Sequence, residues 1–102
     1  MKTRVQIGEP VKQFVLALAP EPRRKTWRAI KDLADGAGDV LQLEGSLTPF
    51  FRLRVGRIRV VFAETSTGGE RVLNCFFADY RSTVYQALEQ MIASGLLDEL
   101  KR

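Results

Sequence analysis

Four arginines stand close together in the stretch FFRLRVGRIRVVF, which covers residues 50–62. They are Arg52, Arg54, Arg57 and Arg59, and no acidic residue lies among them. Arginine makes bidentate contacts with phosphate and carboxylate groups and stays charged. Like charges that face each other across paired strands destabilise the pairing. The chemistry that this spacing favours is the binding of an anionic group, which would relieve the repulsion.

Alternation of these arginines with apolar residues predicts two half-buried strands. Gly56 interrupts the pattern and predicts a two-residue turn, either Gly56-Arg57 or Val55-Gly56. Both registers place the same apolar residues on one face: Phe51, Leu53, Val55, Ile58, Val60 and Phe62. The opposite face, called the arginine face below, consists of Arg52, Arg54 and Arg59. A merely solvated sheet face remains the alternative interpretation.

Composition bounds the class of protein. The 102 residues suffice for one compact domain, predicted over 1–102, and 45% hydrophobic with 27% charged residues is typical of a soluble protein. No apolar run reaches membrane-spanning length, and MKTRVQIGEP lacks the apolar core of a signal peptide, so a cytoplasmic location and no membrane partner are expected. A net charge of +4 favours a nucleic acid or an acidic protein as partner.

The chain has no histidine and one cysteine, Cys75. This composition excludes Ser–His and Cys–His nucleophile pairs and histidine-based metal sites, and no metal-ligand spacing is present. Neither a metal nor a small-molecule cofactor is expected. Any catalysis must therefore use Arg, Lys, Tyr, Asp, Glu or backbone groups. Cys75, within the apolar run VLNCFFA, is expected to be a buried thiol.

The elements that must position these residues follow the order β-α-α-β-β-β-β-α. The strand-like segments are TRVQI, VLQLEG, FFRLRV, RIRVVFAE and RVLNCFFA, and the helical ones are EPVKQFVLALA, RRKTWRAIKDLADG and STVYQALEQMIASGLLDELKR. The two early helices should form a hairpin because their link is short. We expect an α+β domain with the helices packed on one side of a small, mostly antiparallel sheet.

Local signals refine the helices. The second helix should bury Trp27, Ile30, Leu33 and Ala34 along one stripe. Ser82 is the predicted N-cap of the last helix. Gly95 is a predicted break, which leaves residues 95–102 as a last turn or a mobile tail.

The motifs LEG-SLTPFFRLRVGRIRVVFAE and RSTVY resemble the RelE/ParE toxin superfamily in order and spacing. The resemblance spans roughly residues 3 to 92. It implies a helical hairpin and a C-terminal helix around a small antiparallel sheet. It also implies the toxin of a two-gene toxin–antitoxin pair, whose partner is an acidic antitoxin. RelE-like members cut messenger RNA in the ribosomal A site, whereas ParE-like members poison DNA gyrase.

Residue-by-residue comparison favours the RelE branch. Arg52 and Arg54 match the paired basic residues of a family strand, and Arg59 matches the arginine after the glycine turn. Arg81 and Tyr85 match the arginine and tyrosine at the start of the last helix. The resemblance thus implies catalytic roles for Arg59, Arg81 and Tyr85. Arg52 and Arg54, with Arg23, Arg24 and Arg28 of the second helix, would bind RNA.

The chemistry implied is cleavage of RNA by its own 2′-hydroxyl, without a metal. Arginines in a concave site stabilise the charge that develops on the phosphate. Tyr85 would act as the general base or would stack on a nucleotide base. The chain departs from the family pattern at Ala78 and Asp79, where some active members carry another basic residue. Asp79 near the site would weaken its hold on phosphate.

The expected function is therefore a ribosome-dependent messenger RNA endoribonuclease that acts on the ribosome and inhibits translation. The alternatives are a gyrase poison and an inactive relative that only binds its antitoxin. Individual residues keep structural alternatives too. Tyr85 is also compatible with a partly buried helix position, Arg81 with a place beside the helix cap, and the second-helix arginines with a solvated face.

Overall fold

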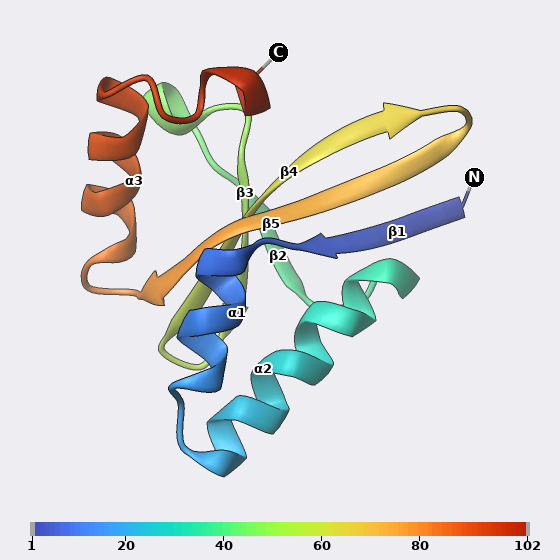
Figure 1. Ribbon diagram of the computed structural model, residues 1–102, viewed down its shortest axis with the longest axis vertical. Coiled ribbons are helices and arrows are strands. Elements are labelled where there is room, and N and C mark those ends of the chain that lie inside the picture. The colour runs from blue at the N-terminus through green and yellow to red at the C-terminus, as the bar shows by residue number, and fades with distance from the viewer. Residues whose placement is uncertain (1, 102) are drawn as a thin grey trace.

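The computed structural model describes residues 2–101, and within them five strands pair in the order β1-β5-β4-β3-β2 (Figure 1). The strands are β1 Lys2–Ile7, β2 Asp39–Gln42, β3 Phe51–Val55, β4 Ile58–Thr67 and β5 Glu70–Tyr80. β1 runs parallel to β5, whereas the other neighbours are antiparallel. The predicted α+β class and the mostly antiparallel sheet are confirmed.

The helices are α1 Glu9–Leu16, α2 Pro20–Asp32 and α3 Val84–Ala93, with short 3₁₀ turns at Leu33–Asp35, Gly45–Leu47 and Asp98–Lys101. A proline stands in the first turn of α1 and of α2, where its missing N–H costs no helical hydrogen bond. Gly36, with a φ of 77°, closes the turn that follows α2 in the left-handed conformation. The two helices form the predicted hairpin.

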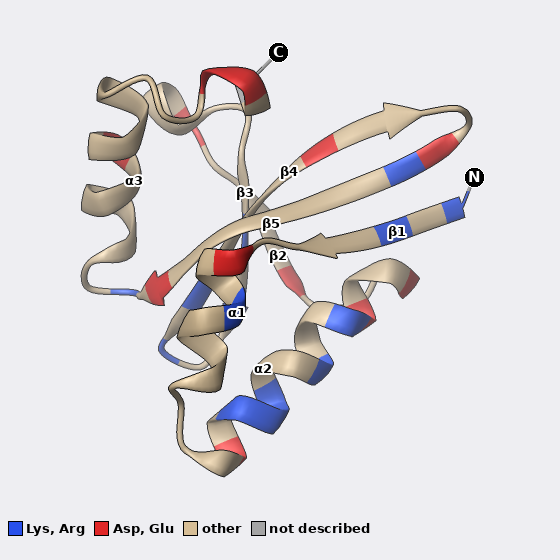
Figure 2. Cartoon of the chain, viewed as in Figure 1, with Lys and Arg blue, Asp and Glu red and all other residues tan. Residues whose placement is uncertain are grey.

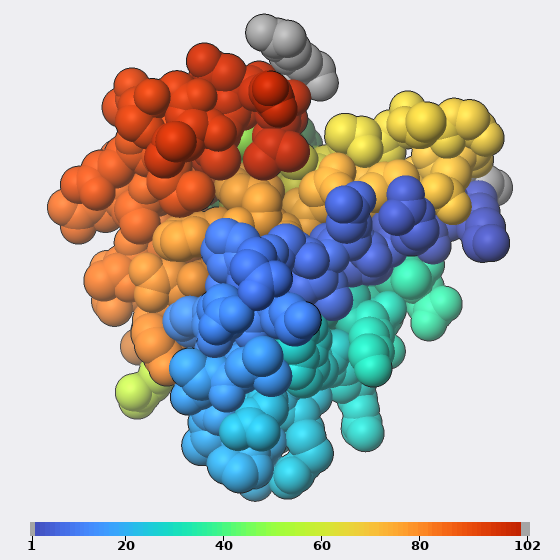
Figure 3. All heavy atoms as spheres, viewed as in Figure 1, coloured from blue at the N-terminus to red at the C-terminus, as the bar shows by residue number. Residues whose placement is uncertain are grey.

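The helices cover both faces of the sheet, so the expectation that all of them pack on one side is wrong. The α1–α2 hairpin packs on the face that carries Leu53, Val60 and Phe62. α3 packs on the opposite face, with Val61 and Ala63. The four consecutive β4 residues Val60–Ala63 are each at most 2% exposed. A strand buried on both faces has such a continuous apolar run, and the sequence VVFA carried that signal. In Figures 1 and 3, α3 lies at the upper left of the molecule and the α1–α2 hairpin lies at the bottom.

The β3–β4 connection has the predicted register. Val55 pairs with Ile58, which leaves Gly56 and Arg57 as the turn. Gly56, the first turn residue, has a positive φ of 59°, whereas Arg57, the second, does not have a positive φ. This combination is that of a type II′ turn. The β4–β5 ladder contains one irregularity, a shift between Val61 and Phe62, which leaves Phe76 as an extra residue in β5.

The ends of the helices differ from prediction in two details. α3 begins at Val84 with Thr83 before it, so Ser82 is not its N-cap, and the Thr83 hydroxyl instead donates to the Tyr80 carbonyl at 3.4 Å. Ala34 is exposed because α2 has already given way to a 3₁₀ turn at that point.

Leu97, beyond Gly95, is 4% exposed and packs with the α3-side core. None of the helices in residues 2–101 is both long and apolar enough to cross a membrane.

Candidate nucleic-acid interface

The β3–β4 strand pair places the arginine face on the α3 side of the sheet. Arg54 pairs with Arg59 across the β3–β4 ladder, and Arg52 pairs with Val61, a residue of the α3-side core. The predicted grouping of Arg52, Arg54 and Arg59 on one face is thus confirmed. The like-charge contact across the strands is also present.

Neighbouring strands supply acids on both sides of this pair. Asp39 of β2 pairs with Arg54, and Asp79 of β5 pairs with Arg59. One row across four strands therefore reads acid, arginine, arginine, acid. The two acids reduce the repulsion between the arginines, which answers part of the puzzle raised by the sequence without any ligand.

Asp39 holds both arginines of β3. Its Oδ1 accepts a hydrogen bond from Arg52 Nη1 at 3.1 Å, and its Oδ2 lies 3.5 Å from Arg54 Nε. Arg52 Nη1 also donates to the Asp39 carbonyl at 2.9 Å. The Arg52 side chain is 13% exposed, whereas that of Arg54 is 57% exposed. Arg54 is thus the more available of the two for a bound anion.

Arg59 is held by the turn that precedes it. Its Nη1 donates to the Gly56 carbonyl at 2.8 Å and to the Ile58 carbonyl at 3.0 Å. Asp79, its neighbour in the ladder, accepts the Tyr80 N–H at 2.8 Å through Oδ1. These bonds fix the Arg59 guanidinium close to the backbone at the end of the sheet.

Tyr85 and Arg81 flank the start of α3. Tyr85 is partly buried and packs against the α3-side core, so it shares a side of the sheet with the arginine face. Arg81 is exposed, and its backbone N–H donates to the Arg57 carbonyl at 2.8 Å. That bond ties the end of β5 to the β3–β4 turn.

The second-helix arginines do not join this group. Arg23, Arg24 and Arg28 belong to α2, which covers the other face of the sheet, and Figure 2 shows their helix lined with basic residues. The Arg23 guanidinium donates to the Leu18 carbonyl at 3.0 and 3.3 Å, so it braces the link between α1 and α2. An RNA-binding role was predicted both for these arginines and for Arg52 and Arg54, and the structure places the two groups on opposite faces of the sheet.

Cys75 occupies the interior of the hairpin-side core, as expected. Burial raises the pKa of its thiol from an ordinary value of 9.0 to about 12. Among residues 2–101, no three Cys, Asp or Glu side chains gather as a metal site would require.

Known structures share this architecture, although no protein-family model and no curated protein sequence matches the chain. The fold is that of RelE toxins, as the sequence resemblance implied. The RelBE2 toxin–antitoxin complex of Mycobacterium tuberculosis aligns with a TM-score of 0.63 and 17% identity, over 79% of this chain and 100% of that chain. An archaeal RelE–RelB complex from Pyrococcus horikoshii aligns with a TM-score of 0.58 and 22% identity, over 79% of this chain and 97% of that chain. The RelB–RelE complex of Methanococcus jannaschii aligns with a TM-score of 0.56 and 13% identity, over 80% of this chain and 96% of that chain.

Proposed function

We propose that this protein is the toxin of a toxin–antitoxin pair and that it cleaves messenger RNA on the ribosome. The observation that carries the proposal is the placement of Arg52, Arg54 and Arg59 on the same side of the sheet as Tyr85. The shared fold with RelE toxins of solved toxin–antitoxin complexes supports it.

The proposed reaction is attack of an RNA 2′-hydroxyl on the adjacent phosphate, which forms a 2′,3′-cyclic phosphate and breaks the bond from phosphorus to the 5′-oxygen of the next nucleotide. That oxygen leaves and takes up a proton as a 5′-hydroxyl. Arg54, the more exposed β3 arginine, binds the phosphate with Arg52 beside it. Arg59 stabilises the charge that develops in the transition state, because its guanidinium is already held by two carbonyls and needs little reorganisation. Tyr85 takes the hydroxyl proton or stacks on a base. Arg81 holds the RNA backbone at the start of α3.

The proposed partners are an acidic antitoxin, the ribosome and messenger RNA, and the proposed location is the cytoplasm. An amphipathic acidic segment suits a basic surface. Arg24 and Arg28, on the other face, would contact ribosomal RNA rather than the cleaved phosphate, because α2 lies across the sheet from the arginine face.

A second candidate is a toxin-fold protein without RNA cleavage, which either poisons DNA gyrase or only binds its antitoxin. The acids beside the arginine face favour it. Asp39 contacts both β3 arginines, and Asp79 pairs with Arg59 in the ladder. Each carboxylate weakens the hold of its neighbouring arginine on phosphate.

Single-turnover cleavage of a messenger bound to programmed ribosomes separates the two candidates. The proposal expects cleavage by the wild-type protein and cleavage slowed by about 10²–10³ in Arg59→Ala. DNA supercoiling by gyrase, measured with the same preparation, is the parallel assay. A folded protein that leaves the messenger intact but stops supercoiling would establish the gyrase alternative instead.

A further inference from the structure

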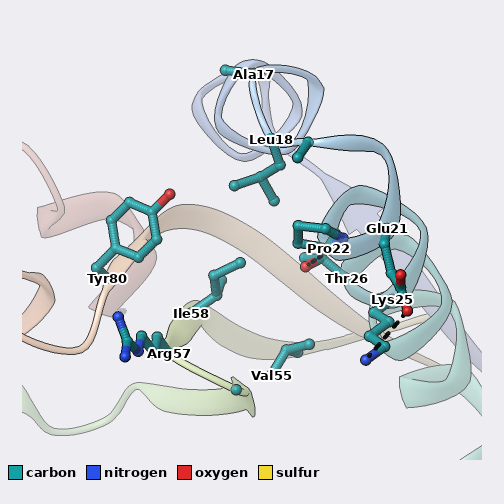
Figure 4. A pocket seen from close by; sticks show the side chains of 12 residues that line it. Ala17, Leu18, Glu21, Pro22, Lys25, Thr26, Val55, Arg57, Ile58 and Tyr80 are labelled. Carbon is teal, nitrogen blue, oxygen red and sulfur yellow. Dashed lines mark hydrogen bonds and ion pairs between the residues drawn. The ribbon is translucent and has the colours of Figure 1, made fainter.

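A groove opens on the hairpin side of the sheet, away from the arginine face. It lies between the α1–α2 link and the β3–β4 turn and has a volume of about 530 Å³. Apolar side chains form much of its wall, among them Leu18, Pro22, Val55 and Ile58. Figure 4 shows Tyr80 and Arg57 toward one end of the groove and the Glu21–Lys25 pair toward the other. Clefts of this size and lining are typical of sites for small ligands.

A second hollow of about 350 Å³ adjoins the groove. It is lined by Arg57, Tyr80, Arg81 and Ser82, so Arg57 and Tyr80 belong to both cavities. The Arg81 N–H donates a hydrogen bond to the Arg57 carbonyl at 2.8 Å. This bond holds the backbone of Arg57 and the backbone of Arg81 next to each other. The apolar groove thus shares two residues with this second hollow, called the notch below, which is lined by two arginines, a tyrosine and a serine.

The charges around both cavities favour an anion. Register places Asp79 with Arg59 and Tyr80 with Ile58, so the carboxylate of Asp79 belongs to the opposite face of the sheet. Glu21 lines the groove, but it lies 3.8 Å from Lys25 Nζ and is partly neutralised. Among the described residues, neither Arg57 nor Arg81 forms an ion pair with an acid within 4.0 Å.

Tyr80 is suited to hold a flat ring. Phe14 of α1 lies on the same side of the sheet as Tyr80. The Phe14 ring contacts the Tyr80 ring edge to face, with centroids 5.3 Å apart. Tyr80 is nevertheless 44% exposed, which is high for an aromatic residue at the end of a central strand. A ring fixed at its edge and open to solvent loses little conformational freedom when a base stacks on it.

We propose that this groove binds one nucleotide of single-stranded RNA, with the base against Tyr80 and Ile58 and the phosphate at Arg57 and Arg81. This inference rests on the proposed function, because it takes RNA as the anion. The site lies on the other side of the β3–β4 turn from Arg59, so it would hold a nucleotide that flanks the cleaved phosphate. An amphipathic helix would need a longer groove with several anchor positions, which a compact cavity of this size does not offer.

Binding of a fluorescein-labelled oligouridylate to the isolated protein tests the site without ribosomes or cleavage. Tyr80→Ala should weaken binding at least about fivefold, as expected when one stacking contact is lost. Tyr80→Phe should retain the affinity because the ring remains. Arg57→Ala should lower the slope of log affinity against log salt by about one unit. Arg4→Ala, which removes an exposed arginine of β1, is the matched control and should lower the slope less.

The proposal is overturned if wild-type protein fails to bind the oligonucleotide at low salt. It is also overturned if Tyr80→Ala and Arg57→Ala both bind like Arg4→Ala. Failure of the proposed function has a different signature. In that case the oligonucleotide binds through Tyr80 and Arg57, but the messenger on programmed ribosomes stays intact.

Discussion

Asp79 lies directly opposite Arg59 in the ladder between β4 and β5. The residue that we assign to transition-state stabilisation therefore has a carboxylate as its cross-strand neighbour. Opposite charges at such positions stabilise the folded sheet, yet the same carboxylate opposes a phosphate at Arg59. Stability and anion binding thus compete at this one pair.

Replacing Asp79 by asparagine should raise affinity for RNA and the rate of cleavage. Removing one negative charge beside the site changes the free energy of phosphate binding by about 1 kcal/mol, roughly fivefold in affinity. Asparagine keeps an oxygen that accepts the Tyr80 N–H. Ribosome binding and single-turnover cleavage measure the effect, with exposed Asp35→Asn as the charge-matched control. Equal gains in both variants would mean that only net charge matters.

The two β3 arginines should contribute unequally to RNA binding. Arg54→Ala should flatten the salt dependence of ribosome binding by about one unit, because its side chain is 57% exposed. Arg52→Ala should flatten it less and should lower the free energy of unfolding more, since Arg52 donates to both the carbonyl and the carboxylate of Asp39. A salt series and urea unfolding of both variants check this order. Equal slopes, unchanged from wild type, would support a solvated sheet face.

The roles of Arg59 and Tyr85 separate in single-turnover kinetics. Arg59→Ala should slow cleavage by about 10²–10³ with a smaller effect on binding, because its contact strengthens only in the transition state. Tyr85→Phe should lose rate if the hydroxyl is the base, and should keep it if the ring only stacks. Tyr85→Ala should lose activity in both cases. Circular dichroism controls for folding, and full activity of both Arg59→Ala and Tyr85→Phe would place the catalytic site elsewhere.

Two adjacent leucines test how the segment after Gly95 is attached. Leu97→Ala should destabilise the fold by about 2–5 kcal/mol, because Leu97 is 4% exposed in the α3-side core. Leu96→Ala, at 73% exposure, should change the free energy of unfolding by no more than about 0.5 kcal/mol. Urea denaturation of the two variants gives the comparison. Equal midpoints would mean that this segment is mobile, as the sequence also allowed.

The Cys75 thiol should resist alkylation and disulfide reagents at mildly alkaline pH. Burial raises its pKa to about 12, so the reactive thiolate is scarce in the folded protein. Between the ordinary value of 9.0 and about 12, the unfolded chain releases this proton and the folded chain keeps it. The contribution of Cys75 to stability is therefore complete below the lower value and is lost as pH rises. Fast labelling of native protein would contradict this burial.

The sequence predicted what is local in this fold and missed what depends on distant pairing. Alternation around Gly56 placed Arg52, Arg54 and Arg59 correctly, because a two-residue turn fixes both the register and the faces. The contact of Asp39 with Arg52 and Arg54 was missed, since a loop and a 3₁₀ turn separate β2 from β3. Likewise, the face that α3 covers depends on the chain path after β5, which no local pattern specifies. The uninterrupted apolar run Val60–Ala63 was the available signal for two covered faces, and all four residues are buried.

The extra residue at Phe76 gives β5 two phases of alternation. Before it, odd-numbered residues such as Leu73 and Cys75 belong to the hairpin side, and after it the even-numbered Ala78 does. Phe76 and Phe77 both pack on the α3 side. Because of this extra residue, Tyr80 lies on the groove side of the sheet and Asp79 lies on the side of Arg59. A single-residue insertion in a strand thus assigns an aromatic ring to one surface and a carboxylate to the other, without any change in either residue.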